Sequence, residues 1–144
     1  EGGLAQEIAR CLSDLTTIET PVVSVILGEG TGGGAIALLP ADYTIASQHG
    51  WLAPLPPEGA SAIIHRNLDH AMEMAEAQGV SSQALLKNKI VDHVVPELPD
   101  AADEPAEFCA RLAASLEQTL AHLANIDTAT LLNDRYDRYR RLGL

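Results

Sequence analysis

Apolar residues recur three and four positions apart at the start of the chain, a period typical of an amphipathic helix. Leu4, Ile8, Leu12 and Leu15 share one face of a helix predicted over residues 4–16. A largely apolar run rich in β-branched residues follows over 22–27 and predicts a strand covered on both faces. Because a helix leads into such a strand, we expect a parallel sheet whose preceding strand lies upstream, so that the chain begins in mid-fold.

The same patterns predict short elements in alternation after this strand. Pro40 ends a short helix behind a glycine-rich turn, Gly79 is a helix terminator, and Pro96 closes a strand. The predicted helices cover 35–39, 60–65, 68–78 and a stretch capped by Ser81 or Ser82 that runs through 86, and the predicted strands cover 43–47, 51–55 and 90–95.

Two longer helices complete the pattern. An apolar stripe from Phe108 to Leu123 predicts the first, with Pro105 in its first turn. Asp127 is the predicted cap of the second. Its acid–base pairs spaced four apart indicate a solvated face, and these pairs are Asp134–Arg138 and Asp137–Arg141.

The composition fits one soluble α/β domain and excludes several classes of partner. The formal net charge of -11 over 144 residues argues against a general nucleic-acid or anionic-membrane surface. No apolar stretch approaches the roughly 20 residues that span a bilayer, and no charged-then-apolar leader opens the chain. We therefore expect a cytoplasmic protein.

The spacing of cysteine and histidine gives no reason to assign a metal. Cys11 and Cys109 have no CxxC or histidine companions and are predicted to be buried thiols. His65 and His70 are five residues apart, which would place them on different sides of one helix. We expect no metal in this chain.

The glycine-dense segment behind the first predicted strand carries the strongest chemical signal. Gly28, Gly30, Gly32, Gly33 and Gly34 can adopt positive φ and let another molecule approach their N–H groups. The helix that follows adds a dipole favourable to negative charge. The segment predicts an anion or oxyanion site built from main-chain amides.

Three other interpretations of this segment are weaker. Gly28, Gly30 and Gly33 fit the GxGxxG dinucleotide-binding pattern, but Pro40 ends the helix early and no acid follows the next strand. No Lys-Ser or Lys-Thr follows the glycines, as a phosphate-cradling loop requires. Tight packing of a helix on a sheet needs one or two glycines rather than five.

Several linked motifs resemble the α subunit of bacterial acetyl-CoA carboxylase carboxyltransferase. The segment GEGTGGGAIAL is similar to the family's GEGGSGGALAI, PPEGASAII resembles its SPEG-containing helix start, and QALLKNKIVDHVVPE resembles a helix, turn and strand of the crotonase superfamily. The likeness covers residues 3–97. Thr31, Gly32 and Pro56 depart from the pattern, and Lys89 stands where glycine is common. Asn88 or Lys89 must therefore adopt the positive φ of the turn, a conformation that asparagine tolerates best.

The resemblance implies a fold and a division of the chain. The fold is a ClpP/crotonase-like α/β spiral, incomplete at its N-terminal side, with C-terminal α-helices. Residues 1–97 would form the C-terminal part of a crotonase-like carboxyltransferase core, and residues 98–144 a helical extension of the same domain.

The resemblance also implies a reaction. A carboxyl group passes from carboxybiotin, held on a separate biotin carboxyl carrier protein, to acetyl-CoA, giving malonyl-CoA for fatty acid biosynthesis. The amides of Gly33 and Gly34 would hold the biotin ureido oxygen, because preorganised donors suit an oxygen that gains charge. The implied partner is a β-like carboxyltransferase domain or subunit, within an oligomer. The implied substrate-binding residues are Gly30, Thr31, Gly32, Ala35, Glu58 and Gly59.

Two acids and two other functions stay open at this point. Glu58 can line the pocket or act as a general acid, but an acid that orders a helix start is the simpler interpretation. Glu29 faces the same choice within its own loop. The alternative functions are a crotonase-like enoyl-CoA hydratase or isomerase, which would need one or two carboxylates near the oxyanion donors, and a non-catalytic assembly module.

Overall fold

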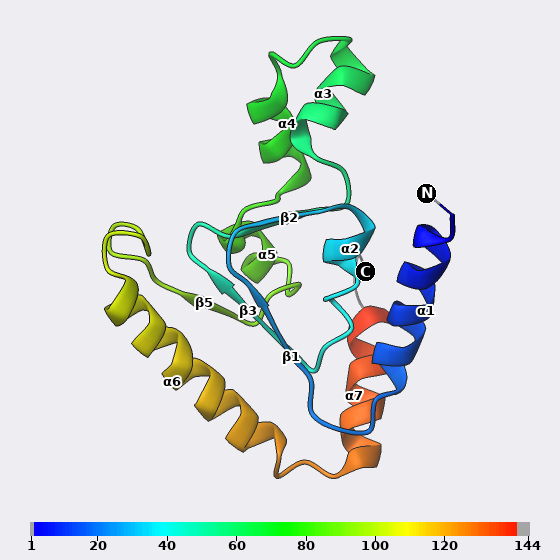
Figure 1. The fold of residues 1–144 in the computed structure, drawn as a ribbon, viewed down its shortest axis with the longest axis vertical. Helices are drawn as coiled ribbons and strands as arrows, with labels where there is room; N and C mark the ends of the chain where they lie inside the picture. The colour runs from blue at the N-terminus through cyan, green and yellow to red at the C-terminus, as the bar shows by residue number, and fades with distance from the viewer. Residues whose placement is uncertain (1, 141–144) are drawn as a thin grey trace.

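The computed structural model describes residues 2–140, in which helices surround a small parallel sheet (Figure 1). After the first helix, two pairs of strands follow one another, the first pair followed by one helix and the second by three, and a last strand leads to two terminal helices. In chain order the elements are α1 (Leu4–Thr17), β1 (Val23–Ile26), β2 (Glu29–Thr31), α2 (Gly32–Ile36), β3 (Tyr43–Ser47), β4 (Trp51–Ala53), α3 (Pro57–His65), α4 (Ala71–Gln78), α5 (Ser82–Lys87), β5 (His93–Val95), α6 (Pro105–Leu123) and α7 (Thr128–Arg140).

The strands stack as successive turns of a spiral. β1, β3 and β5 form one parallel sheet, with Val23 opposite Tyr43 and Ile45 opposite His93. β2 and β4 form a second parallel pair in which Glu29 lies opposite Trp51. Each strand of the second unit therefore lies beside its counterpart in the first, as parallel pairing through crossover connections requires.

The core lies on both faces of β3. Neighbouring residues of a strand point to opposite faces, and Ile45 and Ala46 are both fully buried. Ala46 packs in a cluster with Ile26, Leu52, Leu85 and Val91. Ile45 packs with Val95 and with Phe108 of α6, so α6 covers one face of this sheet. The run 43–47 was predicted as a strand with these same bounds, and this prediction is confirmed.

Helix α7 is held to the body of the protein through two arginines, contrary to the solvated face predicted for it. Arg135 is only 1% exposed and bonds to Asp42, and Arg138 forms its ion pair with Asp92 at 2.7 Å rather than with Asp134. The prediction failed because the acids that pair with α7 are distant in sequence. The other predicted pair involves Arg141, which lies outside the described residues.

Three further expectations are corrected by the structure. Cys11 and Cys109 are exposed, because they lie on the outer sides of α1 and α6. Lys89 rather than Asn88 takes the left-handed turn, with φ of 59°. The helix behind the glycine turn begins at Gly32 instead of Ala35, and residues 29–31 pair with β4 as strand β2. A strand of three residues is too short to show a periodic pattern in the sequence. It is defined by its pairing with β4.

Most other element predictions are confirmed within two or three residues. Ser81 caps α5 by accepting a hydrogen bond from the amide of Ala84, and Gly79 ends α4 with φ of 64°. Asp127 accepts a bond from the amide of Thr130 at the start of α7. No helix among residues 2–140 combines the length and apolarity needed to cross a membrane. The division of the chain at residue 97 stays a prediction.

Candidate functional site

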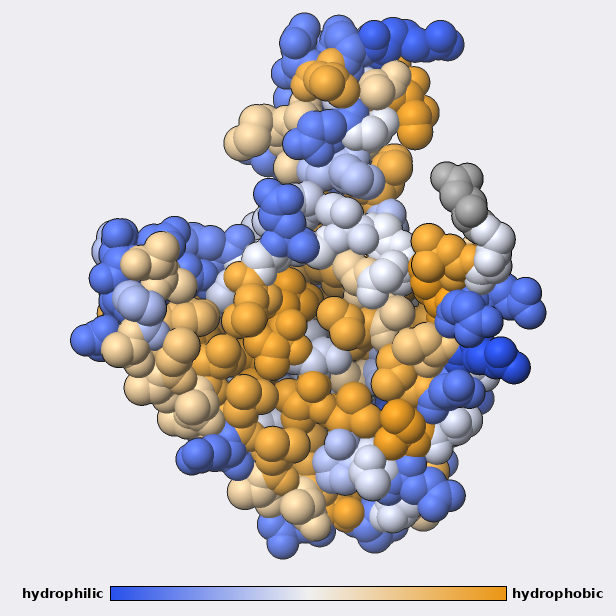
Figure 2. All heavy atoms as spheres, in the orientation of Figure 1, coloured by the Kyte–Doolittle hydropathy of each residue, from blue (hydrophilic) through white to orange (hydrophobic). Residues whose placement is uncertain are grey.

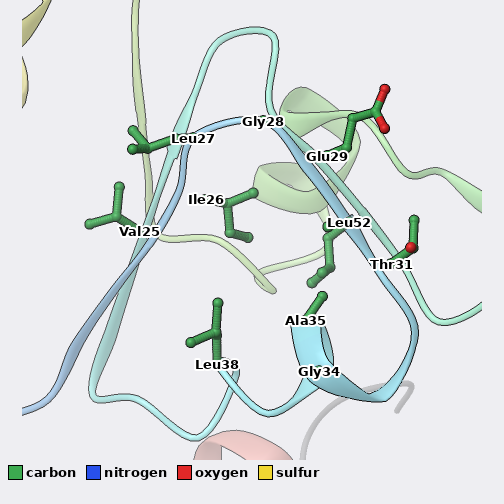
Figure 3. Close-up of a pocket in the computed structure, with 11 residues that line it drawn as sticks. Val25, Ile26, Leu27, Gly28, Glu29, Thr31, Gly34, Ala35, Leu38 and Leu52 are labelled. Carbon is green, nitrogen blue, oxygen red and sulfur yellow. The ribbon is translucent and has the colours of Figure 1, made fainter.

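An apolar cavity of about 390 Å³ opens between β1, β2 and the start of α2 (Figure 3). Its walls are hydrophobic side chains from β1 and β4 together with the backbone of the glycine segment. The lining residues are Val25, Ile26, Leu27, Gly28, Glu29, Gly30, Thr31, Gly34, Ala35, Leu38 and Leu52. The predicted glycine segment therefore does border a cavity.

The turn that leads into α2 leaves backbone amides without an acceptor among the described residues. Thr31 is extended, with φ of -132° and ψ of 152°, and Gly32 then takes a φ of +68°, which a residue with a side chain rarely adopts. The first amides of a helix have no acceptor within the helix. Among the described residues, neither the Gly33 amide nor the Gly34 amide has a hydrogen-bond acceptor.

Gly33 and Gly34 differ in what surrounds them. A Cβ at Gly34 would meet no atom within 4 Å, and Gly34 lines the cavity. A Cβ at Gly33 would lie 3.4 Å from the Ile8 side chain of α1, and Gly33 is not among the cavity-lining residues. Of the two glycines predicted to be catalytic, the structure therefore places Gly34 at the cavity and Gly33 against α1.

Gly30 has a packing role as well as a place in the cavity wall. A Cβ there would lie 2.9 Å from Leu52 Cδ1 and 3.3 Å from the carbonyl oxygen of Trp51. A larger residue would therefore require the Leu52 side chain or the strand backbone to shift. The packing interpretation, weak for the segment as a whole, applies to this glycine.

The two predicted substrate-binding residues on α3 lie away from this cavity. Glu58 is an exposed residue of the first turn of α3, and neither it nor Gly59 lines the cavity. Thr31 and Ala35 do line it, whereas Gly32 does not. Glu29 belongs to the lining, but Figure 3 shows its carboxylate pointing away from the space between Ile26, Leu52 and Ala35.

Sequence reasoning missed the apolar rim of the cavity. The side chains of Leu27 and Leu38 are 60% and 50% exposed although both residues line it. Figure 2 shows hydrophobic residues gathered over the same face of the molecule. Leu27 was predicted as the last residue of a strand covered on both faces, so its sequence pattern gives no sign that it is exposed.

Two groups of histidines and carboxylates lie elsewhere on the described part of the chain. His49 Nδ1 lies 3.2 Å from Glu97 Oε2 and 3.5 Å from Asp100 Oδ2. Burial alone would raise the pKa of Glu97, but hydrogen bonds from the amides of His49 and Ala101 and from Ser47 leave this pKa below its ordinary value.

The second group corrects the predicted placement of two histidines. His65 and His70 were expected on different sides of one helix, but their rings stack with centroids 4.0 Å apart. The prediction is wrong because the helix ends at His65, where Arg66 takes a φ of 63°, and a new helix starts after His70. Glu73 completes this group.

Solved structures define the class of fold first. The chain superimposes on a Pseudomonas malonate decarboxylase hetero-tetramer in complex with coenzyme A with a TM-score of 0.68 at 18% identity, covering 97% of this chain and 59% of that one. It superimposes on an enoyl-CoA hydratase from Mycobacterium avium subsp. paratuberculosis with a TM-score of 0.61 at 23% identity, covering 95% of this chain and 58% of that one. The fold is the α/β crotonase-like fold, as predicted.

Sequence comparison then gives the family. The family model described as acetyl co-enzyme A carboxylase carboxyltransferase-like matches residues 1–143, and the chain belongs to this family. It is 56% identical over its whole length to a probable biotin-dependent acyl-coenzyme A carboxylase beta3 subunit of Mycobacterium tuberculosis, of which it covers 29%. It is 38% identical over 99% of its length to an acetyl-coenzyme A carboxylase carboxyl transferase subunit alpha of Rubrobacter xylanophilus, of which it covers 45%. The chain thus spans less than half of either relative.

Proposed function

We propose that this chain supplies the biotin-binding side of a carboxyltransferase active site. In this proposal the amide of Gly34, supported by that of Gly33, donates a hydrogen bond to the ureido oxygen of carboxybiotin. The observation that supports it most directly is the Gly34 amide, which has no acceptor among residues 2–140 and belongs to a residue that lines an apolar cavity. Membership of the carboxyltransferase family supplies the reaction class.

The chemistry explains why backbone amides suit this role. When the carboxyl group leaves the biotin nitrogen, negative charge builds on the ureido oxygen. Fixed donors stabilise that charge without reorganising, and one such donor contributes about 2.7–4 kcal/mol in hydrolases. Gly34 is exposed beside these apolar walls, and a partner that covered the cavity would exclude water and strengthen this interaction.

The lining of the cavity favours carboxyl transfer over the hydratase alternative. A hydratase or isomerase needs one or two carboxylates near the oxyanion donors to move protons. Among the described lining residues Glu29 is the one carboxylate, and it points outward. Glu58 lies outside the lining, which supports its interpretation as the acid that orders the start of α3.

We propose acetyl-CoA as the acceptor and malonyl-CoA as the product, which would serve fatty acid biosynthesis. The names of the alpha-subunit relatives support acetyl-CoA, while the name of the mycobacterial relative extends to acyl-CoA in general. Comparing kcat/KM for acetyl-CoA and propionyl-CoA tests this choice. A preference for propionyl-CoA would overturn the acetyl-CoA proposal and leave the carboxyl-transfer proposal standing.

The proposed partners are a β-like carboxyltransferase domain, which would hold the acyl-CoA, and a biotin carboxyl carrier protein, within an oligomer. Exposed leucines at the cavity rim, Leu27 and Leu38, are of the kind that a partner surface covers. Docking of the β-like domain at this rim would bring the acyl-CoA beside the Gly34 amide.

The test is Gly34→Val in the full carboxyltransferase. A Cβ at position 34 meets no atom within 4 Å, and the branched side chain of valine would fill space beside the amide. We expect carboxyl transfer to fall by about 10²–10³-fold, as loss of one oxyanion donor does, while acyl-CoA binding and circular dichroism stay unchanged. Gly2→Val, also in open space, is the matched control. A folded Gly34→Val enzyme with the wild-type rate would contradict the proposal, as would hydration of crotonyl-CoA by the wild-type protein.

A further inference from the structure

Three potential metal ligands meet at the tip of the hairpin formed by α3 and α4, which projects from the body of the protein (Figure 1). His65 is the last residue of α3, His70 caps α4, and Glu73 lies in the first turn of α4. One ligand atom from each of the three lies within 4.8 Å of the other two. His70 Nδ1 is 3.1 Å from Glu73 Oε1.

One ring nitrogen of this group makes no hydrogen bond to the described residues. His65 Nε2 is buried and has no hydrogen-bond partner among the described residues. A buried polar atom is normally paired, and an unpaired one points to a missing water or ion. The ring that carries this nitrogen stacks on a second imidazole, and Glu73 belongs to the same cluster; both of these side chains can ligate a metal.

The backbone that carries the three ligands is fixed by other groups. Ser61 is fully buried, and its hydroxyl donates to the carbonyl of Asn67 at 2.7 Å and accepts from the amide of His70 at 3.2 Å. Arg66 makes the left-handed turn between the helices. The hairpin therefore brings His65 and His70 together through bonds that do not involve their rings, and His65 Nε2 stays unpaired while His70 Nδ1 already lies beside the Glu73 carboxylate.

We propose that His65, His70 and Glu73 bind a divalent metal ion of the zinc type and that this ion joins the end of α3 to the start of α4. Two imidazole nitrogens and one carboxylate oxygen are a common ligand set for Zn²⁺, with a fourth position open to water. The ion would stabilise the hairpin and take no part in carboxyl transfer, since none of its three ligands lines the cavity.

Binding requires a modest rearrangement of the side chains. Ligand atoms around a tetrahedral zinc lie roughly 3.3 Å apart, given bonds of about 2.0–2.1 Å. The lone pair of an imidazole lies in the plane of its ring, so the two stacked rings must tilt until both point at the ion. The side chain of His70 is 36% exposed and has room to turn.

Cobalt binding by the full chain, without a histidine tag, tests this proposal. After treatment with a chelator, the protein is titrated with Co²⁺, whose visible spectrum reports tetrahedral coordination, and Zn²⁺ is then added as a competitor. We expect one Co²⁺ per chain, displaced by Zn²⁺, and a melting temperature that Zn²⁺ raises and a chelator restores. His70→Ala and Glu73→Gln should each weaken binding by about tenfold or more, since loss of a supporting group alone costs that much.

Two control variants make the result decisive. His93→Ala removes an exposed histidine of β5 and should leave Co²⁺ binding unchanged. His49→Ala removes the histidine of the other cluster and should also leave it unchanged. The proposal is overturned by the absence of Co²⁺ binding, by full binding in folded His70→Ala and Glu73→Gln, or by loss of binding in His49→Ala. None of these results bears on the Gly34 proposal, which rests on a different activity and a different part of the molecule.

Discussion

The guanidinium of Arg135 bonds both carboxylate oxygens of Asp42, with Nε 2.8 Å from Oδ1 and Nη2 2.8 Å from Oδ2. The same carboxylate accepts a bond from the amide of Val22, just before β1. Arg135 also donates to the carbonyls of Leu15 and Ile18 at the end of α1. One buried side chain therefore connects α7, α1 and the sheet.

This connection extends to the candidate site. The Ile8 side chain of α1 lies against Gly33, so α1 forms the backing of the glycine turn. Arg135 holds the other end of α1. We infer that the position of the Gly33 and Gly34 amides depends in part on a residue about a hundred positions further along the chain.

Arg135→Met should lower the free energy of unfolding by about 3–5 kcal/mol, because it leaves the Asp42 carboxylate buried without its partner. Chemical denaturation measures this change. Arg10→Met is the matched control, since the Arg10 side chain is 69% exposed and its pair with Glu7 is at the surface. Equal effects of the two substitutions would show that the buried network does not contribute as the structure indicates.

Lys89→Gly should raise the free energy of unfolding by about 0.5–1 kcal/mol. The left-handed conformation that Lys89 adopts costs a residue with a side chain roughly 1–2 kcal/mol, and glycine avoids this cost. Glycine loses more backbone entropy on folding, which offsets part of the gain in stability. Thermal and urea unfolding measure the difference. Lys87→Gly, at the end of α5, should instead destabilise the protein by about 1 kcal/mol; a loss of stability in both variants would contradict the assignment of the turn to Lys89.

Glu97 should make stability depend on pH at the acidic end. Its pKa in the folded protein is lowered, so its contribution is complete above the unfolded pKa of about 4.3 and is lost as pH falls through the folded value. We expect Glu97→Gln to be less stable than the wild type near pH 7 and to lose less stability between about pH 5 and 3. Glu7→Gln, whose side chain is 65% exposed, should follow the wild-type curve. Urea titrations at several pH values measure the free energy of unfolding. The same pH dependence in Glu97→Gln and the wild type would contradict the contribution assigned to Glu97.

Gly30→Ala should destabilise the protein by about 1–3 kcal/mol, because the added methyl group overpacks the contact between β2 and β4. Its Cβ would meet Leu52, which is 5% exposed and has little room to move. Gly28→Ala, where nothing lies within 4 Å, is the control for stability. Unchanged unfolding of Gly30→Ala would mean that the strands separate without cost and that Gly30 is present for another reason.

The sequence by itself determined the elements whose signals are local. The run 43–47, the stripe along α6 and the caps at Ser81 and Asp127 are each specified by neighbouring residues, and each was predicted close to its observed bounds. The glycine segment and its flanking motifs also identified the family, through their resemblance to it, and the family match confirms this.

Tertiary structure alone decided which distant residues meet. Strand β2 exists because β4 lies beside it, Arg135 is buried because Asp42 is there to pair with it, and Glu58 lies away from the glycine turn. His65 and His70 stack because a left-handed turn breaks the helix that their spacing predicted to be continuous. Periodicity reports the face of a single element, whereas these contacts depend on how elements pack together, which no local pattern encodes.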